Sequence, residues 1–394
     1  MNMNREEIKK WAEDAYPWAV DVRRTLHRIP ERGFEEFETQ KYICETLDAL
    51  GIPYRTERTW IVGLIEGARP GRVIGLRADM DALPVEEPEG CAFRSAHAGF
   101  MHACGHDIHM AVQLGAAKIL SGMREKLSGC VKLFFQPAEE TVGGAKPMVE
   151  AGVLEDPRVD ASYGLHVQSR LPLGAVETRP GALNASTDDI ELTIVGRGGH
   201  AAYPENSVDA IVCAAQVLTA LQTLVSRSVS PLESAVLTFG VIEGGTASNI
   251  ICERVRLRGT LRTADPALRT RLKARIEEVA AGVAGALGAR AEIEIRPGYA
   301  ALVNHPREAK LVLDVAEELF GAENALTKES PSMGGEDFSY FIENRPGAFY
   351  HIGTTLPENM PAPALHSPLF NPEEGCILTG LMMQTAIVLR ALGL

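Results

Sequence analysis

The segment "HACGHDIH", residues 102 to 109, concentrates side chains that can bind metal ions. Three of the ten histidines of the chain lie in it, together with Cys104 and Asp107. A thiolate and an imidazole two positions apart, Cys104 and His106, are donors that suit Zn²⁺ or a similar first-row metal. Asp107 falls in the first turn of an expected helix, where the helix dipole favours a carboxylate, and this position suits a cap. No second CxxC or HxxxH motif follows, so the remaining ligands must come from elsewhere in the chain.

Four further ligand-type residues stand in short motifs along the chain: Glu139 and Glu140 in "QPAEET", His166 in "GLHV" and His366 in "ALHSPLF". Of two adjacent glutamates, one can bind a metal while the other polarises a bound water. Each residue also has a simpler interpretation. A buried histidine is usually a hydrogen-bonded core residue, adjacent glutamates are usually solvated, and a single cysteine often packs as a small hydrophobic residue. Residue types and spacing leave both interpretations open.

Alternating strands and helices are expected to position these residues. Helices are predicted over 5–28 and 35–50, from about His106, after Gly144 and over 373–392, and buried strands over 72–79, 130–137 and 161–167. This alternation is typical of an α/β domain with a mainly parallel sheet flanked by helices. Asp79, Glu139 and His166 fall at or just after predicted strand ends, where such sheets bind ligands.

The middle of the chain follows a different order. Strands are predicted over 188–196, 235–245, 251–263 and 291–297, with helices over 206–226 and 266–287. The order βαββαβ indicates a ferredoxin-like unit. We therefore expect residues 184–297 to form an inserted domain, and residues 1–183 plus 298–394 to form the first domain.

Composition limits the function classes. The chain has 394 residues, a length typical of two domains, and its net charge of −13 argues against nucleic-acid binding. Its N-terminus has no signal-peptide pattern, and no apolar run is expected to span a membrane. The seven scattered cysteines indicate reduced thiols and a cytoplasmic location. A small-molecule partner fits these limits.

Ten motifs in order give a resemblance that covers nearly the whole chain. The sequence resembles the M20 family of metallopeptidases and amidohydrolases, in the branch of hippurate hydrolases and N-acyl-amino-acid (indole-acetyl-amino-acid type) amidohydrolases. The motifs are "LHRIPERGFEEFET", "GLRADMDALPVEE", "MHACGHDIHM", "FFQPAEET", "GLHV", "GRGGHAAYPENSVDA", "GGTASNII", "GTLRT", "GGEDFSYF" and "LHSPLF".

The resemblance implies a two-metal site. Its divalent ions are Zn²⁺ or Mn²⁺, with Co²⁺ or Ni²⁺ as further possibilities, and its ligands are Cys104, His106, Glu140, His166 and His366. It implies that Glu139 is the general base and that Asp81 orients the site from behind the ligands. Relatives outside this branch have HxD where this chain has Asp79-Met80-Asp81, so Asp79 is not assigned as a ligand. His102 and His109 are expected to form hydrogen bonds around the site.

The resemblance also implies that the inserted domain serves as a lid and dimerisation domain, in a homodimer or homotetramer. His200 would stabilise the oxyanion in the active site of the partner subunit. Asn249, Arg262 and the loop of Gly335 would contact the substrate. A simpler interpretation of Arg262 is also open, because Arg254, Arg256 and Arg258 alternate along the same predicted strand and could line its solvent face.

The activity implied is metal-dependent hydrolysis of the amide of N-acyl-amino acids, such as hippurate or N-acetyl-amino acids. Three alternatives remain open. The same centre could serve a dipeptidase or carboxypeptidase, or an N-acetyl-diaminopimelate deacetylase. A protein that binds metal without catalysis is the third, and the glutamate pair argues against it.

Overall fold

The computed structural model describes residues 5–394, and the chain forms two compact units. The first unit contains the chain up to Gly181, Val303–Glu329 and Asp337–Leu394, and the second contains Ala182–Leu302 and Ser330–Glu336. Residues 1–4 of the first predicted domain lie outside the described residues. The segment 330–336, which the sequence analysis left in the first domain, packs with the second unit because Ser332 N–H donates to Leu183 and Ala185 N–H donates to Ser332.

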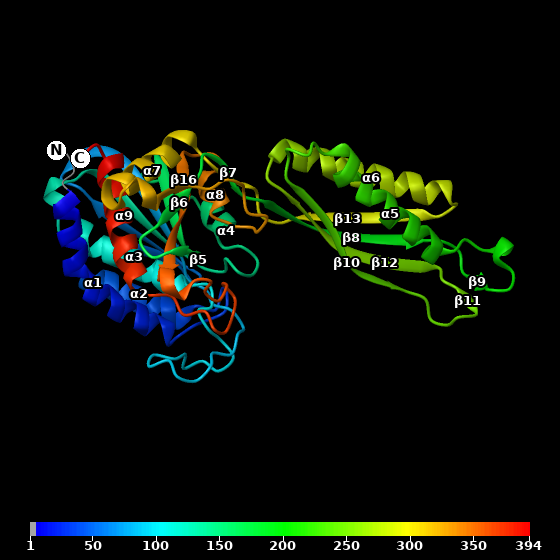
Figure 1. Ribbon diagram of the computed structural model, residues 1–394, viewed down its shortest axis with the longest axis horizontal. Helices are drawn as coiled ribbons and strands as arrows, with labels where there is room; N and C mark the ends of the chain where they lie inside the picture. The colour runs from blue at the N-terminus through cyan, green and yellow to red at the C-terminus, as the bar shows by residue number, and fades with distance from the viewer. Residues whose placement is uncertain (1–4) are drawn as a thin grey trace. The chain divides into compact units, whose positions relative to one another are not determined.

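The first unit is built on an eight-stranded sheet in the order β1-β2-β4-β3-β5-β16-β6-β15. Its four central strands run parallel: β4 (Ser128–Gln136), β3 (Arg69–Asp79), β5 (Ala161–Pro172) and β16 (Gly347–Thr355). The outer strands are β1 (Tyr54–Glu57), β2 (Trp60–Glu66), β6 (Val176–Thr178) and β15 (Ala325–Thr327). The pairs β1–β2, β2–β4 and β6–β16 are antiparallel. The unit therefore has the expected α/β architecture with a mainly parallel sheet (Figure 1).

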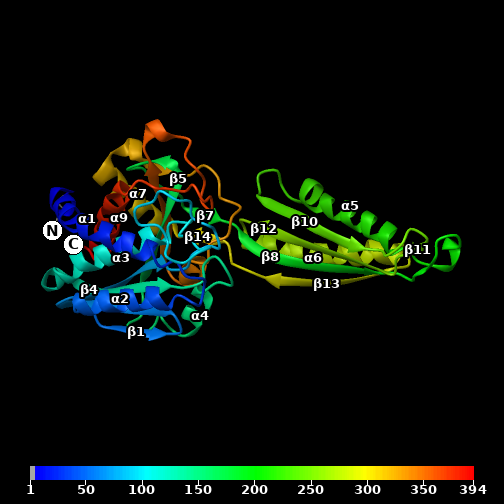
Figure 2. The same cartoon turned by 90° about the horizontal axis from the view of Figure 1, so that it is seen from below.

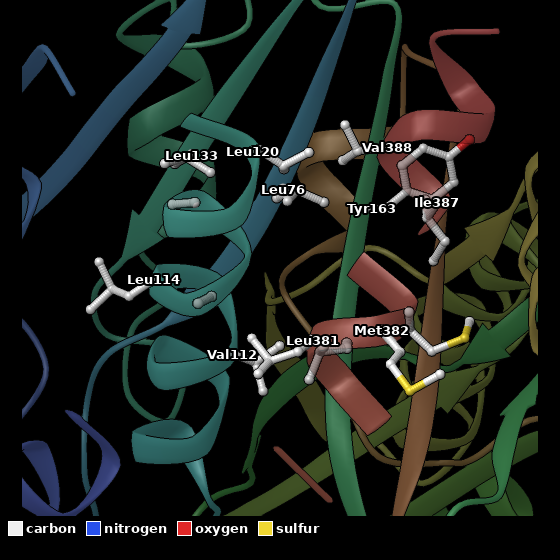
Figure 3. Packing of buried hydrophobic residues seen from close by; sticks show 14 of the residues in the cluster. Leu76, Val112, Leu114, Leu120, Leu133, Tyr163, Leu381, Met382, Ile387 and Val388 are labelled. Atoms are coloured by element: carbon white, nitrogen blue, oxygen red, sulfur yellow. The ribbon is translucent and has the colours of Figure 1, made fainter. Parts of the chain in front are cut away.

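Helices α1 (Arg5–His27), α3 (His106–Ser121) and α9 (Gly375–Ala391) pack on one another, and α3 and α9 also pack on the central strands. Figure 3 shows Val112 and Leu120 of α3 facing Leu381 and Val388 of α9. The two helices lie so close together that a Cβ at Gly380 would be only 2.6 Å from the Val112 side chain. Glycine at this position therefore permits the close packing. The remaining helices of this unit are α2 (Phe37–Ala49), α4 (Ala145–Glu150), α7 (Pro306–Phe320) and α8 (Ser339–Ile342).

Strand register brings the chemically important residues to one level of the sheet. Asp79 of β3 lies opposite Gln136 of β4, and Leu76 of β3 lies opposite Tyr163 of β5. Counting three residues onward on both strands places Asp79 level with His166. The "PAEE" loop begins directly after Gln136. Parallel strands end at the same edge of a sheet, so this edge collects the predicted site.

The second unit has a four-stranded antiparallel sheet in the order β10-β12-β8-β13. Its strands are β8 (Ser186–Val195), β10 (Ala235–Gly244), β12 (Arg254–Thr263) and β13 (Arg290–Pro297), and α5 (Ala210–Ser228) and α6 (Pro266–Ala286) cover one face (Figure 1). Chain order and strand order are those of the predicted ferredoxin-like unit. Figure 2 shows a short ribbon, β9 (Gly199–His200) with β11 (Ile250–Ile251), at one end of this sheet. Two more short strands, β7 (Gly181–Asn184) and β14 (Leu302–Asn304), lie where the chain passes between units.

Two predicted elements of this unit differ from the structure. Helix α5 begins at Ala210 rather than near 206, because the Asp209 carboxylate accepts hydrogen bonds from Ile211 N–H and Val212 N–H and so caps the helix. The predicted strand over 251–263 is two strands, since Ile251 pairs with Gly199 in the ribbon whereas Arg254 pairs with Val195 in the sheet.

Helix α5 is also long and apolar enough, by length and composition, to cross a membrane, which the sequence analysis did not expect. The structure accounts for much of this apolar content. Cys213, Val217 and Leu221 of α5 are buried in the core of the second unit, together with Leu192 and Leu257 from its sheet.

Candidate metal centre

Two groups of ligand-type side chains share the Cys104 thiol. One group is Cys104, His106 and His166, the other is Cys104, Glu140 and His366, and the ligand atoms of each lie within 4.8 Å of one another. The Cys104 Sγ lies 3.4 Å from His166 Nε2 and 3.3 Å from His366 Nε2. The structure thus brings together all five residues that the resemblance implies as ligands, from four separate parts of the chain.

The donor set fits metal ions better than it fits a hydrogen-bond network. His106 Nε2 is buried without a hydrogen-bond partner among the described residues, and it lies 3.8 Å from Asp79 Oδ2 and 3.9 Å from Glu140 Oε1. Such an atom is costly to bury unless something binds it. Sulfur, imidazole and carboxylate donors in two groups with one shared ligand are suited to a pair of first-row divalent ions.

Asp81 holds the glutamate loop with its carboxylate and the candidate ligand His106 with its backbone carbonyl. Its two oxygens accept hydrogen bonds from Glu139 N–H at 3.0 Å and Glu140 N–H at 2.9 Å. His106 Nδ1 donates to the Asp81 backbone carbonyl at 2.8 Å, which directs His106 Nε2 toward the candidate metal position. A histidine ligand is typically oriented in this way by a hydrogen bond from its other nitrogen.

Asp79 lies beside His106, in a buried network. Arg77 donates to Asp79 Oδ2 at 2.6 Å and to Asp337 Oδ1 at 2.9 Å, and His109 Nδ1 donates to Asp79 Oδ1 at 2.6 Å. His109 Nε2 accepts a hydrogen bond from the backbone N–H of Val167. The expectation that His109 forms hydrogen bonds around the site is confirmed.

Burial shapes the charge of the centre. Burial, together with the nearby Glu140 and Glu139, raises the pKa of the Cys104 thiol well above its usual value. Burial lowers the pKa of His166, with a further contribution from His109. Burial also acts to lower the pKa of His106, but Asp79 and Asp81 outweigh it and raise that pKa to about 10. A thiolate at Cys104 therefore needs a compensating cation nearby, and a divalent ion would supply it.

Two residues of the opening segment behave differently from expectation. Asp107 does not cap α3, because its Oδ2 accepts hydrogen bonds from Arg23 Nε and His27 Nδ1, both at 2.8 Å. The two ring nitrogens of His102 are buried, and neither has a hydrogen-bond partner in the described part of the chain, so its expected hydrogen bonds are not found. The sequence analysis missed Arg23 and His27, although His27 lies in the quoted motif "LHRIPERGFEEFET".

His200 and Asn249 lie close together in the second unit. His200 pairs with Ile250 in the β9–β11 ribbon, and the Asn249 carbonyl accepts a hydrogen bond from Ala201 N–H. Both side chains are exposed. This ribbon follows the end of the sheet where Arg254 pairs with Val195.

Arg262 lies at the other end of the same sheet, opposite Thr187. Gly335 lies close to Arg262. A Cβ at Gly335 would be 2.7 Å from the Thr187 side chain, 3.1 Å from the Tyr299 ring and 3.8 Å from an Arg262 nitrogen. Only glycine fits this contact without displacement. Arg262 and the Gly335 loop therefore form one local surface.

Comparison with known proteins identifies the family of this chain. Residues 75–389 match the model of Peptidase family M20/M25/M40. The chain belongs to the M20 family. It is 38% identical over 361 residues to the N-acetyldiaminopimelate deacetylase of Priestia megaterium, covering 91% of this chain and 94% of that protein. A Synechocystis sp. protein described as a probable hydrolase is 39% identical over 379 residues, covering 95% and 96%.

A solved structure extends the likeness to the fold. The YXEP protein of Bacillus subtilis, described as a dinuclear metal-binding peptidase of the M20 family, superposes with a TM-score of 0.84 at 32% identity, covering 97% of this chain and 99% of that one. The resemblance read from the motifs is confirmed, and the chain is an enzyme of the M20 hydrolase family. The two groups that share Cys104 could hold a pair of metal ions.

The Asp81 contacts generate a prediction. Asp81→Asn keeps one acceptor but places an NH₂ group against a backbone N–H, so the glutamate loop should shift, whereas the bond from His106 to the Asp81 backbone carbonyl remains. We expect a 10- to 100-fold loss of activity or metal affinity, the usual scale for groups that orient ligands. Steady-state kinetics and elemental analysis measure both quantities, with the surface variant Asp48→Asn as the matched control. Unchanged kcat and unchanged metal content would contradict this role.

Proposed function

We propose that this enzyme is a two-metal amidohydrolase of N-acyl-amino acids, and that N-acetyldiaminopimelate is the first substrate to test. The observation that carries the proposal is the convergence of Cys104, His106, Glu140, His166 and His366 beside a second glutamate, Glu139. Each of the five is proposed as a ligand. Bound ions, Zn²⁺ or Mn²⁺ and alternatively Co²⁺ or Ni²⁺, would polarise the amide carbonyl and lower the pKa of a water toward about 7.

The residues of the chain then have separate roles in the reaction. Glu139 accepts a proton from the attacking water as it adds to the amide carbon, and delivers a proton to the leaving amine nitrogen. Asp81 keeps Glu139 and Glu140 in place through their backbone N–H groups. His200 donates a hydrogen bond to the oxygen that becomes negative during the attack. The products are a carboxylic acid and a free amino acid.

The choice of acyl group rests on the relatives. Several of them, at 38 to 39% identity and more than 90% coverage, are named N-acetyldiaminopimelate deacetylase. These names favour an acetyl group over the benzoyl group of hippurate, which the sequence analysis gave as a leading example. Other similar proteins are described only as hydrolase or amidohydrolase, so other N-acyl-amino acids, hippurate among them, stay in the test. A peptide presents the same amide next to a carboxylate, so a dipeptidase or carboxypeptidase is the competing activity.

Arg262 is proposed to bind the carboxylate of the substrate. The solvent-face interpretation explains Arg254, Arg256 and Arg258, which pair with Glu292, Glu191 and Glu243. In the part of the chain that the structure describes, Arg262 has no such ion pair. Its half-buried guanidinium beside the Gly335 loop is therefore available for a bidentate contact with a carboxylate. Asn249 and Gly335 are proposed as further substrate contacts.

The arrangement of the second unit supports a site shared between subunits. His200 and Asn249 belong to one end of the sheet and Arg262 to the other, and eight residues of β12 span about 26 Å. A small substrate cannot contact both ends of one sheet. We infer that a site receives Arg262 from one chain and His200 from its partner, as the family resemblance implies.

The surface of the second unit offers a place for the partner chain. Strand β10 is an edge strand, with exposed Val236 and Ile242, and an edge strand can pair with another chain. Ile211 and Val212 on the adjoining helix α5 are 48% and 55% exposed. We propose that this surface forms a homodimer, which can assemble further into a homotetramer.

We propose a cytoplasmic location for the enzyme. All seven cysteines are free thiols, which fits a reducing compartment. The net charge of −13 makes nucleic acid a poor partner. The apolar residues on the buried face of α5 pack on the sheet of the second unit, so the packing of this unit accounts for them without a membrane.

A substrate panel tests the proposed function. N-acetyldiaminopimelate, N-acetyl-amino acids, hippurate and dipeptides are supplied to the metal-loaded enzyme, and release of free amine is measured. We expect the N-acyl-amino acids to give higher kcat/KM than the dipeptides. Among the N-acyl-amino acids, we expect N-acetyldiaminopimelate to give the highest kcat/KM. Preference for dipeptides by tenfold or more would instead support the peptidase alternative.

Glu139→Gln tests the proposed base on the best substrate of the panel. Glutamine keeps the volume of the side chain but cannot accept the proton, so we expect kcat to fall at least about 100-fold. Metal content should be unchanged, because Glu139 is not among the proposed ligands. Near-normal kcat in the purified, metal-loaded variant would remove Glu139 from this role.

The proposed ligands are tested by metal removal. A chelator should inactivate the enzyme, and Mn²⁺ or Zn²⁺ should restore it. Alanine at His366 or Cys104 should lower the bound metal measured by elemental analysis, and the loss should be larger for Cys104 because both groups share it. Full metal content in His366→Ala would exclude His366 from the centre.

Sharing of the site predicts complementation between two inactive variants. In a heterodimer of Glu139→Gln and His200→Ala chains, one site has an intact Glu139 together with an intact His200 from the partner. Random exchange makes half of the dimers heterodimers, so about a quarter of wild-type activity should return. No recovery, with subunit exchange demonstrated by mass spectrometry, would mean that His200 does not act across subunits.

A further inference from the structure

A second group of ligand-type side chains lies in the first unit and shares no residue with the candidate metal centre. It contains His27 from the end of α1, and Glu87 and Cys91 from the loop between β3 and α3. The three ligand atoms lie within 4.8 Å of one another. His27 Nε2 lies 3.1 Å from Glu87 Oε1, and the Cys91 Sγ lies within 4.8 Å of both side chains.

Two of these side chains are held by contacts behind them. His27 Nδ1 donates to Asp107 Oδ2 at 2.8 Å, which directs Nε2 toward Glu87. Glu87 Oε2 accepts a hydrogen bond from Ser95 N–H at 2.7 Å. A carboxylate behind an imidazole is the usual device that orients a histidine ligand. His27 and Glu87 are buried, at 3% and 4% exposure, so neither is a solvated surface residue.

The charges around the group balance in two ways. Three carboxylates, Asp107, Glu374 and Glu87, face two guanidiniums, Arg23 and Arg24. Without a metal ion, a proton on His27 completes neutrality. Burial acts to lower the pKa of His27, but Asp107 and Glu87 outweigh it and raise that pKa to about 9. With Zn²⁺, a neutral His27 and a Cys91 thiolate, the group is neutral again. A divalent ion can therefore replace two protons without leaving a buried charge uncompensated.

The group is open to ions from solution. A pocket of about 500 Å³ is lined by His27, Glu87, Cys91, Phe93 and Leu369, and the exposed Glu89 adds a negative charge at its rim. Zinc ligands lie about 2.0–2.3 Å from the ion, so ligands around one tetrahedral ion are about 3.3–3.8 Å apart. Small side-chain shifts in the Glu87–Cys91 loop bring the three ligand atoms to that spacing.

We propose that His27, Glu87 and Cys91 form an additional Zn²⁺ site, with water from the pocket as the fourth ligand. Binding releases one proton from His27 and one from the Cys91 thiol. The site is independent of the proposed catalytic function, because none of its ligands belongs to the Cys104 centre. Asp107, which supports His27, follows directly after His106 in the chain.

Zinc stoichiometry tests this site. The full-length enzyme is saturated with Zn²⁺ and desalted, and zinc per chain is measured for the wild type, Cys91→Ser and the control Cys44→Ser, a half-buried thiol on α2. We expect Cys91→Ser to hold one zinc ion fewer than the other two proteins, with unchanged hydrolysis of the best amide substrate. Equal zinc content in all three proteins would overturn the proposal.

A second measurement leaves all three ligands intact. Alkylation of Cys91 by an uncharged reagent is followed by mass spectrometry in the wild-type enzyme, with and without added Zn²⁺. Zinc should slow modification of Cys91 at least tenfold and leave Cys44 unaffected, and Glu87→Gln should weaken this protection. The same alkylation rate at Cys91 with and without zinc would contradict the proposal.

Discussion

The position of the Cys104 thiol between two sets of donors is the constraint on which the first unit depends. One sulfur lies within 3.4 Å of imidazoles from two segments, His166 on β5 and His366 beyond β16. The Cys104 thiol is buried close to Glu139 and Glu140, so its thiolate form requires cations nearby. Every element around it must therefore be fixed to within a fraction of an ångström. The parallel strands achieve this, because their register sets the relative height of Asp79, Gln136 and His166.

The supporting residues divide this task. Asp81 holds the glutamate loop through the backbone N–H groups of Glu139 and Glu140 rather than through their side chains. Arg77 joins Asp79 to Asp337, and Asp337 also accepts hydrogen bonds from Gln136 and Ala145 N–H. A buried ion pair is stable only when its remaining hydrogen bonds are satisfied, and this network satisfies them. It ties the ends of β3 and β4 to the segment before α8.

Much of this could be predicted from the sequence because strand and helix periodicity is a local property. The central strands, α1, α3, α9 and the βαββαβ order all follow from short patterns, and the five candidate ligands follow from motifs. The contacts of Asp107 could not be predicted in this way. Its position in a first helical turn favoured a cap, but Arg23 and His27 lie about eighty positions away in sequence and reach it only through packing of α1 on α3. Segment 330–336 joined the second unit for a similar reason, since its backbone bonds to residues near 184 are not visible in a local pattern.

Asp79 occupies the strand end at which the family resemblance implies a histidine outside this branch. Relatives outside the branch have a histidine at this strand end, and here both oxygens of the aspartate are engaged, one by Arg77 and one by His109. Burial opposes ionisation of Asp79, yet Arg77, His106 and His109 hold the pKa of Asp79 well below its usual range. The aspartate is thus a fixed negative charge beside two imidazoles. Because the end of β3 carries an aspartate, imidazole ligands must come from neighbouring elements. His106 at the start of α3 and His166 on β5 are placed to supply them.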